Sequence, residues 1–313
     1  MESPQQYPAV NAPEYSETAA PGPSPHLPAS NHIEAKKPRV WTVFLAFVVV
    51  AIVGFVISGI YVAVASVLTS GASAGSPEKI ARVLENPYIM IPSFSIMGVV
   101  GLIVTGICSA LSPERIRDRL SLHPSRIGAR GYIASIFVVS GISMAVGQVL
   151  SPFTDTNSPT LKLLDKHLRT TSAPWFVLAA VIIAGLAPIA EEVLFRGYMQ
   201  TRLRSRWGAI WAIGITALLF GAFHADPVQS PFAFVIGVSL GYVADRMGSI
   251  RPAIVCHAVN NLISVLGSRF AEKDHAEPTS WPAVAIGIIL ATAGVVWFQR
   301  QSQGPKTLTN RGD

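Results

Sequence analysis

The sequence predicts an all-α fold, in which about eight transmembrane helices form a polytopic membrane bundle. Half of the 313 residues are apolar and only 13% are charged, whereas a soluble globular domain carries about 25% charged residues. The mean hydropathy is accordingly positive, at +0.44. The apolar residues also form long runs. Such runs suit membrane spans, because a helix needs roughly 20 apolar residues to cross a hydrocarbon core about 30 Å thick.

The two ends of the chain differ from this apolar middle. Residues 1–38 are rich in Pro, Ala and Ser and nearly lack bulky aliphatic side chains, so they cannot bury enough apolar surface to fold. They also lack the apolar core of a signal peptide. We therefore expect a disordered Pro-rich cytoplasmic tail over 1–38, a transmembrane helical bundle over 39–300 and a short cytoplasmic tail over 301–313.

Eight apolar segments follow one another along the predicted bundle. The first, WTVFLAFVVVAIVGFVISGIYVAVASVL, and the last, WPAVAIGIILATAGVVWF, are the least ambiguous, whereas the sixth is short and Gly-rich. The predicted spans are 41–68, 88–111, 131–151, 173–200, 208–225, 230–245, 250–267 and 281–299.

Basic residues between the spans support this number. Cytoplasmic loops carry an excess of Lys and Arg, and with eight spans every basic loop lies on one face. The loops on the opposite face, such as LKLLDKHLRT and FAEKDHAE, are mixed in charge. We therefore expect a multi-pass integral membrane protein with both termini cytoplasmic. The basic residues are Lys36, Lys37, Arg39, Arg115, Arg117, Arg119, Arg126, Arg130, Arg202, Arg204, Arg206, Arg246, Arg251, Arg300 and Lys306.

Composition also argues against two other classes of site. The net charge of +6 is spread over short loops, unlike the basic face of a soluble nucleic-acid-binding domain, so no nucleic-acid partner is expected. The two cysteines, Cys108 and Cys256, lie inside apolar segments, where packing is their typical role. They provide neither a disulfide framework nor a C-x-x-C metal motif.

Polar side chains interrupt the apolar character of three of the predicted spans in particular, the fourth, the fifth and the seventh. A charged residue at the centre of a bilayer costs about 2.5–3.5 kcal/mol on insertion scales, so it is usually paired, directed inward and functional. The polar residues in question are Glu191, Glu192 and Arg196 in the fourth span, His224 in the fifth, and His257, Asn260 and Asn261 in the seventh.

The paired glutamates occur in the stretch LAPIAEEVLFRGYMQ. One interpretation makes EEVLFR the solvated end of the fourth span. Against it, apolar residues continue at helical spacing to Arg202, which places Glu191 about 16 Å from that basic cluster. Glu192 and Arg196 can pair at i, i+4 spacing. Glu191 is rotated by about 100° from its neighbour and is free to face the bundle interior, and Pro188 is expected to bend the helix.

The histidines and asparagines complete this polar set. His224 lies near the outer end of the fifth span, deeper than Glu191, and taken alone it is typical of an interfacial histidine. His257 and Asn261 share one helical face, whereas Asn260 points elsewhere and suits helix–helix hydrogen bonding. A buried carboxylate with such donors suits general-base hydrolysis. The same side chains could instead ligate a divalent metal ion.

Three motifs in this set together resemble a known family. EEVLFR fits EExxxR, FGAFH from Phe220 to His224 fits FxxxH, and HAVNN from His257 to Asn261 fits HxxxN. Their order and spacing resemble those of the CAAX protease and bacteriocin-processing family, also called the Abi family, of intramembrane metalloproteases. The resemblance covers about residues 170–270, the expected protease core.

The resemblance implies a membrane-embedded endopeptidase whose site opens toward the cytoplasm. Eukaryotic relatives cleave prenylated CaaX proteins, and bacterial relatives process peptides or serve self-immunity. We expect a peptide or protein substrate at the membrane, with prenylated proteins as one class, and a bacterial plasma-membrane location. The implied roles are Glu191 as general base, His224 as a residue that holds the water, His257 and Asn261 as oxyanion donors, Glu192 and Arg196 as a structural ion pair, and Phe220 as a packing residue.

Metal dependence stays open at this point. Members of the family are often described as metalloproteases, which here implies a Zn²⁺ ion held by Glu191, His224 and His257, whereas another view is a glutamate-dependent mechanism without tight zinc. The sequence has no H-E-x-x-H pair on one helix to decide between them.

Two other classes of function are compatible with buried polar residues. A proton-coupled transporter would use the glutamate and histidines as a relay and would be expected to show internal repeats, but no second EExxxR segment occurs. A catalytically idle membrane adaptor would keep the fold and use it to hold partners.

Overall fold

The protein is described by a computed structural model over residues 39–70, 82–83, 85–112, 114–270 and 278–302. The predicted tail over 1–38 and nearly all of the second tail lie outside these residues. Within the described ranges the regular elements are helices and none is a strand, so the all-α class is confirmed. The helices are α1 (Trp41–Ser70), α3 (Pro87–Ala110), α4 (Ile116–Arg119), α5 (Ala129–Asn157), α6 (Pro159–Thr170), α7 (Ala173–Val181), η1 (Ile182–Leu186), α8 (Ala187–Glu192), η2 (Val193–Gln200), α9 (Thr201–Phe223), α10 (Gln229–Met247), α11 (Arg251–Phe270) and α12 (Trp281–Ser302).

Five helical segments of the described chain are long and apolar enough to cross a membrane, which supports an integral membrane protein. Helices α10 and α11 are not among them, because glycines, asparagines, a histidine and arginines lower their hydropathy. The number of eight crossings therefore stays a prediction. The five segments are Trp41–Thr69, Pro87–Ala110, Ala129–Phe153, Ala173–Phe223 and Trp281–Gln301.

The fourth and fifth predicted spans are joined by helix, not by a basic loop. The helical path from Ala173 to Phe223 is broken only at Gly208, whose φ of 80° suits glycine. Arg202, which we predicted in that loop, is 5% exposed, and its guanidinium carbon lies 3.5 Å from the centroid of the Tyr198 ring. Arginine can bury its charge against an aromatic face and a backbone carbonyl, so charge alone did not end this helix.

A second correction concerns the predicted outer loop LKLLDKHLRT, which is helix α6. The Ser158 hydroxyl caps it by accepting a hydrogen bond from the Leu161 N–H at 3.3 Å, and Pro159 occupies its first turn. Both are helix-start signals. Leu168 is buried, in keeping with the leucines' helical spacing.

Hydrogen bonds and an ion pair hold the basic segments together at one end of the bundle. The N–H of Arg126 donates to the Met247 carbonyl at 2.9 Å, and Arg251 Nε donates to the Leu122 carbonyl at 2.8 Å. Arg204 pairs with Asp245 of α10. Three of the predicted basic loops therefore meet, as a common membrane face requires. That this face is cytoplasmic stays a prediction.

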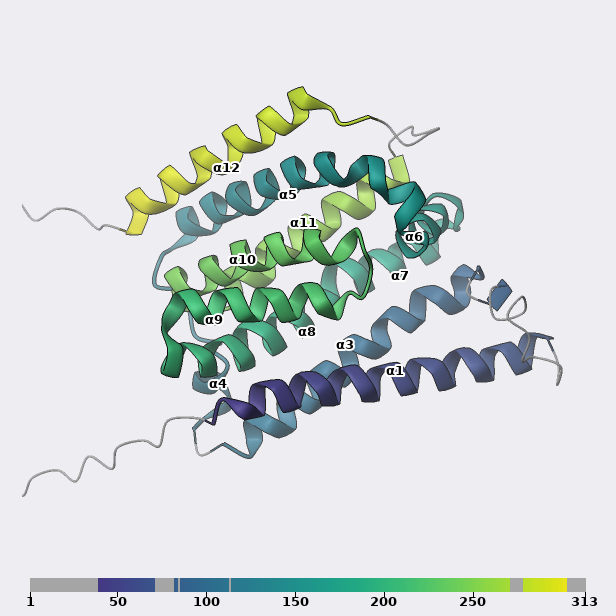
Figure 1. Cartoon of the computed structure of the whole chain (residues 1–313), viewed down its shortest axis with the longest axis horizontal. Coiled ribbons are helices and arrows are strands. Elements are labelled where there is room, and N and C mark those ends of the chain that lie inside the picture. The colour runs from purple at the N-terminus through teal and green to yellow at the C-terminus, as the bar shows by residue number, and fades with distance from the viewer. Residues whose placement is uncertain (1–38, 71–81, 84, 113, 271–277, 303–313) are drawn as a thin grey trace, which may run out of the picture. The chain divides into compact units, whose positions relative to one another are not determined.

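Helix α12 packs closely along α5 through glycines (Figure 1). A Cβ atom at Gly141 would lie 2.5 Å from the Ala291 nitrogen, and one at Gly287 would lie 2.7 Å from the Gly141 carbonyl oxygen. Small residues let membrane helices approach to backbone contact, which is a main source of helix association in lipid.

Gly141→Ala should therefore lower the free energy of unfolding by about 1–3 kcal/mol, the usual cost of overpacking. Gly147→Ala on the same helix is the matched control, because its Cβ would meet only Phe232, at 3.9 Å. Unfolding of both variants in detergent, followed by circular dichroism, measures the difference. Equal stabilities would show that the α5–α12 contact is looser than described.

Candidate active site

Two π-helical turns flank the short helix that carries the glutamates. η1 precedes α8, η2 follows it, and α8 ends with Glu191 and Glu192. At the end of η1, the N–H of Ala187 donates to the carbonyl of Ile182, five residues back. Pro188 lies immediately after this turn and cannot donate a backbone hydrogen bond. The irregularity predicted at Pro188 thus takes the form of a π turn, a feature frequent at functional sites.

Glu192 and Arg196 form the predicted ion pair. Arg196 Nη1 donates to Glu192 Oε1 at 2.9 Å, and both side chains are fully buried. Arg196 Nη2 also donates to the Gly237 carbonyl of α10 at 3.0 Å. The guanidinium carbon lies 4.6 Å from the centroid of the Phe220 ring, which provides a cation–π contact. This pair joins η2, α9 and α10.

His257 connects the two glutamates. Its Nδ1 lies 2.9 Å from Glu192 Oε1. A carboxylate can only accept, so Nδ1 carries the hydrogen and donates it. Nε2 is thereby directed to Glu191, whose Oε2 is 3.7 Å away. Glu192 therefore serves two partners, Arg196 and His257, whereas the sequence had indicated only the first.

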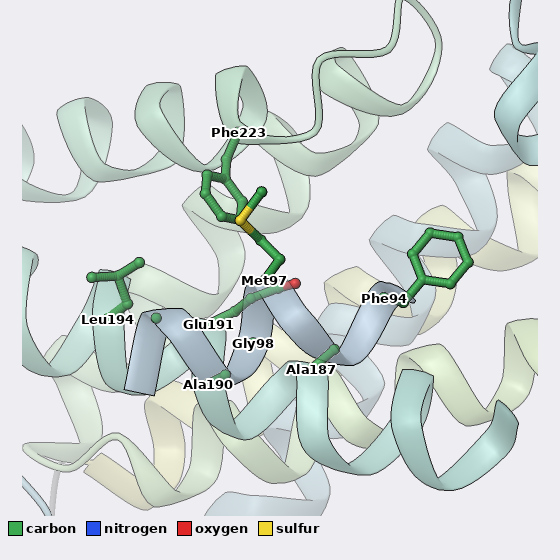
Figure 2. A pocket seen from close by; sticks show the side chains of 9 residues that line it. Phe94, Met97, Gly98, Ala187, Ala190, Glu191, Leu194 and Phe223 are labelled. Carbon is green, nitrogen blue, oxygen red and sulfur yellow. The ribbon is translucent and has the colours of Figure 1, made fainter. Parts of the chain in front are cut away.

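Glu191 faces a small cavity between α3 and α8. Its side chain is 20% exposed, and Figure 2 shows its carboxylate beside Met97. The cavity has a volume of about 40 Å³, so it has room for water. The cavity is lined by Phe94, Met97, Gly98, Gly101, Ala187, Ala190, Glu191, Leu194 and Phe223.

The Phe220 ring contacts both histidines. Its centroid lies 4.9 Å from that of His224 and 5.8 Å from that of His257, edge to face in both cases. His224 Nδ1 donates to the Phe220 carbonyl at 2.8 Å, which leaves Nε2 as the other polar atom of the ring. Among the described residues, Glu191 and His224 form no ion pair. The structure therefore places His257 next to Glu191 and His224 next to Phe220.

Asp226 supports the turn that follows His224, and the sequence analysis missed it. It is 6% exposed and accepts hydrogen bonds from the Ser158 hydroxyl at 2.6 Å and from the N–H groups of Val228 and Gln229 at 2.9 and 2.8 Å. Burial raises the pKa of Asp226, but these hydrogen bonds and the nearby His224 together lower that pKa below its ordinary value. An aspartate just after a helix end was the signal that could have identified it.

The side-chain amide of Asn261 is engaged in hydrogen bonds to residues other than Glu191. Its Nδ2 donates to the Ile183 carbonyl in η1 at 3.0 Å, and its Oδ1 accepts from Asn260 Nδ2 at 3.4 Å. One amide hydrogen remains for another acceptor. Gln200 is a further polar residue that the sequence analysis missed; its Nε2 donates to the Gly241 carbonyl at 2.9 Å. Its i, i+4 spacing from Arg196 in an apolar run was the available signal.

The predicted Zn²⁺ ligands are not gathered as a ligand set. Across the ranges that the structure describes, no three His, Cys, Asp or Glu side chains are arranged to hold a metal ion. Zn²⁺ binding by Glu191, His224 and His257 therefore stays a prediction.

Comparison with known proteins finds a family match over the segment that contains this site. Residues 173–263 match a family model described as type II CAAX prenyl endopeptidase Rce1-like, and all the predicted site residues lie inside the match. This part of the chain is thus similar to the Rce1-like family. The predicted resemblance to the CAAX protease and bacteriocin-processing family is thus confirmed, and the match to an endopeptidase family supports a protease.

The Rce1-like segment also has a curated relative. An uncharacterized 24.3 kDa protein of Escherichia coli is 29% identical over 113 residues, which cover 34% of this chain. The chain spans about half of that relative, 52% of its length. No solved structure matches the chain.

Glu192→Gln should lower the free energy of unfolding by about 3–5 kcal/mol, because it leaves the buried Arg196 charge without its counter-ion. Glu191→Gln is the matched control and should change stability by less than about 1 kcal/mol, since this carboxylate is partly exposed. Denaturant titration in detergent compares the two. Equal destabilisation would contradict the different roles given to the adjacent glutamates.

Proposed function

We propose that the protein is an intramembrane endopeptidase of the CAAX prenyl protease type, with Glu191 as the general base. The observation that carries this proposal is the position of Glu191 between a water-sized cavity and His257 Nε2. A general base must lie within hydrogen-bond reach of the proton that it removes. A water in this cavity satisfies that condition, and the cavity walls are otherwise apolar.

The first chemical step follows from this arrangement. The Glu191 carboxylate takes one proton from the water, and the resulting hydroxide oxygen forms a bond to the carbon of the scissile carbonyl. The electron pair of the C=O double bond moves to its oxygen, which becomes the tetrahedral oxyanion. We assign His224 to hold the water, through the Nε2 that its Phe220 hydrogen bond leaves available.

His257 is the proposed donor to that oxyanion. In its protonated form, Nδ1–H stays on Glu192 while Nε2–H donates to the oxyanion. Asn261 keeps one amide hydrogen for the predicted second bond. When the intermediate collapses, the C–N bond breaks, and Glu191 returns its proton to the leaving amine. The products are a carboxylic acid and an amine.

The proposed substrate is a membrane peptide or protein in which the scissile bond lies at bilayer depth. A helical peptide shields its carbonyls by internal hydrogen bonds, so an extended segment suits this narrow cavity. Prenylated C-terminal segments are held at the membrane by their lipid, and we propose them as the first class to test. The predicted Zn²⁺ ion is a separate proposal, which metal analysis of the purified protein tests.

Glu191→Gln should lower kcat for a cleaved peptide by at least about 1,000-fold, because the amide cannot accept the proton of water. Glu114→Gln is the control: this carboxylate lies on the basic end of the bundle, 47% exposed, and its loss should change kcat by less than about threefold. Purified full-length protein in lipid vesicles, assayed with prenylated and unprenylated peptides by mass spectrometry, provides the measurement. Undiminished cleavage by Glu191→Gln would refute the proposed role.

The same assay separates the alternatives. An adaptor would cleave nothing, and its binding to partners would survive Glu191→Gln. A proton-coupled transporter would instead show flux in the same vesicles that depends on Glu191.

A further inference from the structure

We propose that Asn261 is a positioning residue whose amide replaces the backbone donor that Pro188 lacks, and that it thereby fixes the Glu191-bearing helix α8 in register with α11. The contact itself rests on the geometry of the helices. Its consequence for catalysis rests on the proposed function.

The Asn261 amide binds a carbonyl whose usual backbone N–H donor is missing. In η1 the N–H of Ala187 donates to the Ile182 carbonyl, so the next donor in the π pattern would reach the Ile183 carbonyl. That next residue is Pro188, which has no N–H. Asn261 Nδ2 donates to this same carbonyl at 3.0 Å. Since a carbonyl only accepts, the orientation of the amide is fixed by chemistry.

The hydrogen bond between Asn261 and Ile183 joins the two helical segments that carry the proposed catalytic residues. His257 and Asn261 are one turn apart on α11, and they reach Glu192 and Ile183 respectively, at opposite ends of the segment that contains α8. Two contact points, at Ile183 in η1 and at Glu192 in α8, set both the register and the rotation of this segment against α11. Glu191 lies between these points in the sequence, so its direction relative to His257 Nε2 depends on both.

This role differs from that of an oxyanion donor in one testable respect. An oxyanion donor acts whether or not residue 188 has an N–H, whereas a substitute for a missing backbone donor is needed only while Pro188 is present. Pro188→Ala restores the N–H and is compatible with a helix. A double-mutant cycle between positions 188 and 261 therefore isolates the proposed interaction.

The experiment compares four full-length proteins: the wild type, Asn261→Asp, Pro188→Ala and the double variant. Aspartate keeps the shape of asparagine but removes both N–H donors. With Pro188 present, Asn261→Asp should lower kcat at least about tenfold, with KM within about twofold, because the folded site is misaligned. In the Pro188→Ala background the same change should lower kcat by a factor that is at least about fivefold smaller. Asn261→Leu repeats the cycle without a new charge.

Equal losses of kcat in the two backgrounds would overturn the proposal. Thermal unfolding of the four proteins is the second readout and should show the same coupling. If unfolding is coupled but kcat is not, the positioning role is refuted although the contact exists. If the wild type cleaves no peptide, the proposed function fails, while coupling in the unfolding cycle still supports the contact and additivity refutes it.

Discussion

The centre of this bundle can form only if the buried guanidinium charge of Arg196 is stabilised. An ionised side chain inside an apolar bundle is tolerated only with a counter-ion and with acceptors for its hydrogens. Glu192 provides the counter-ion one turn away, a carbonyl of α10 accepts a second bond, and the Phe220 ring covers one face. Because Glu192 also accepts from His257, the pair that makes the charge tolerable also orients the imidazole toward Glu191.

Two adjacent carboxylates consequently have different environments. Glu192 is fully buried and bonded to two side chains, whereas Glu191 is partly exposed and lines the cavity. Pairs of ionisable groups whose surroundings differ in this way are how active sites divide structural and chemical roles. The π turns on both sides of α8 add to this division, because they change the helical rotation just before and just after the glutamates.

Local patterns in the sequence were sufficient for the parts of the site that depend on one helix. The Glu192–Arg196 pair and the shared face of His257 and Asn261 follow from i, i+4 spacing alone. Contacts between helices were not accessible in this way, since the Glu192–His257 bond depends on how α11 packs. The contact of the Phe220 ring with His257 likewise depends on how α9 and α11 pack.

The difference between patterns within one helix and contacts between side chains also explains where the predicted fold was wrong. The basic residues after Gln200 suggested a loop, but Arg202 stacks on Tyr198 one turn earlier and the helix continues. The leucines of α6 had helical spacing, yet the mixed charges around them suggested an outer loop. In both cases long polar side chains cover apolar surface while their charged ends find partners.

The central claim is that Glu191 acts on water held in the adjacent cavity. Gly98→Val tests it most directly, because Gly98 lines that cavity and a Cβ there makes only ordinary contacts, at 3.5 Å to Ala190 and 3.8 Å to Leu186. Filling the cavity should lower kcat by about 100-fold or more while the protein stays folded. Gly106→Val on the same helix, where a Cβ meets nothing within 4 Å, should leave kcat unchanged. Full cleavage by Gly98→Val would contradict the claim.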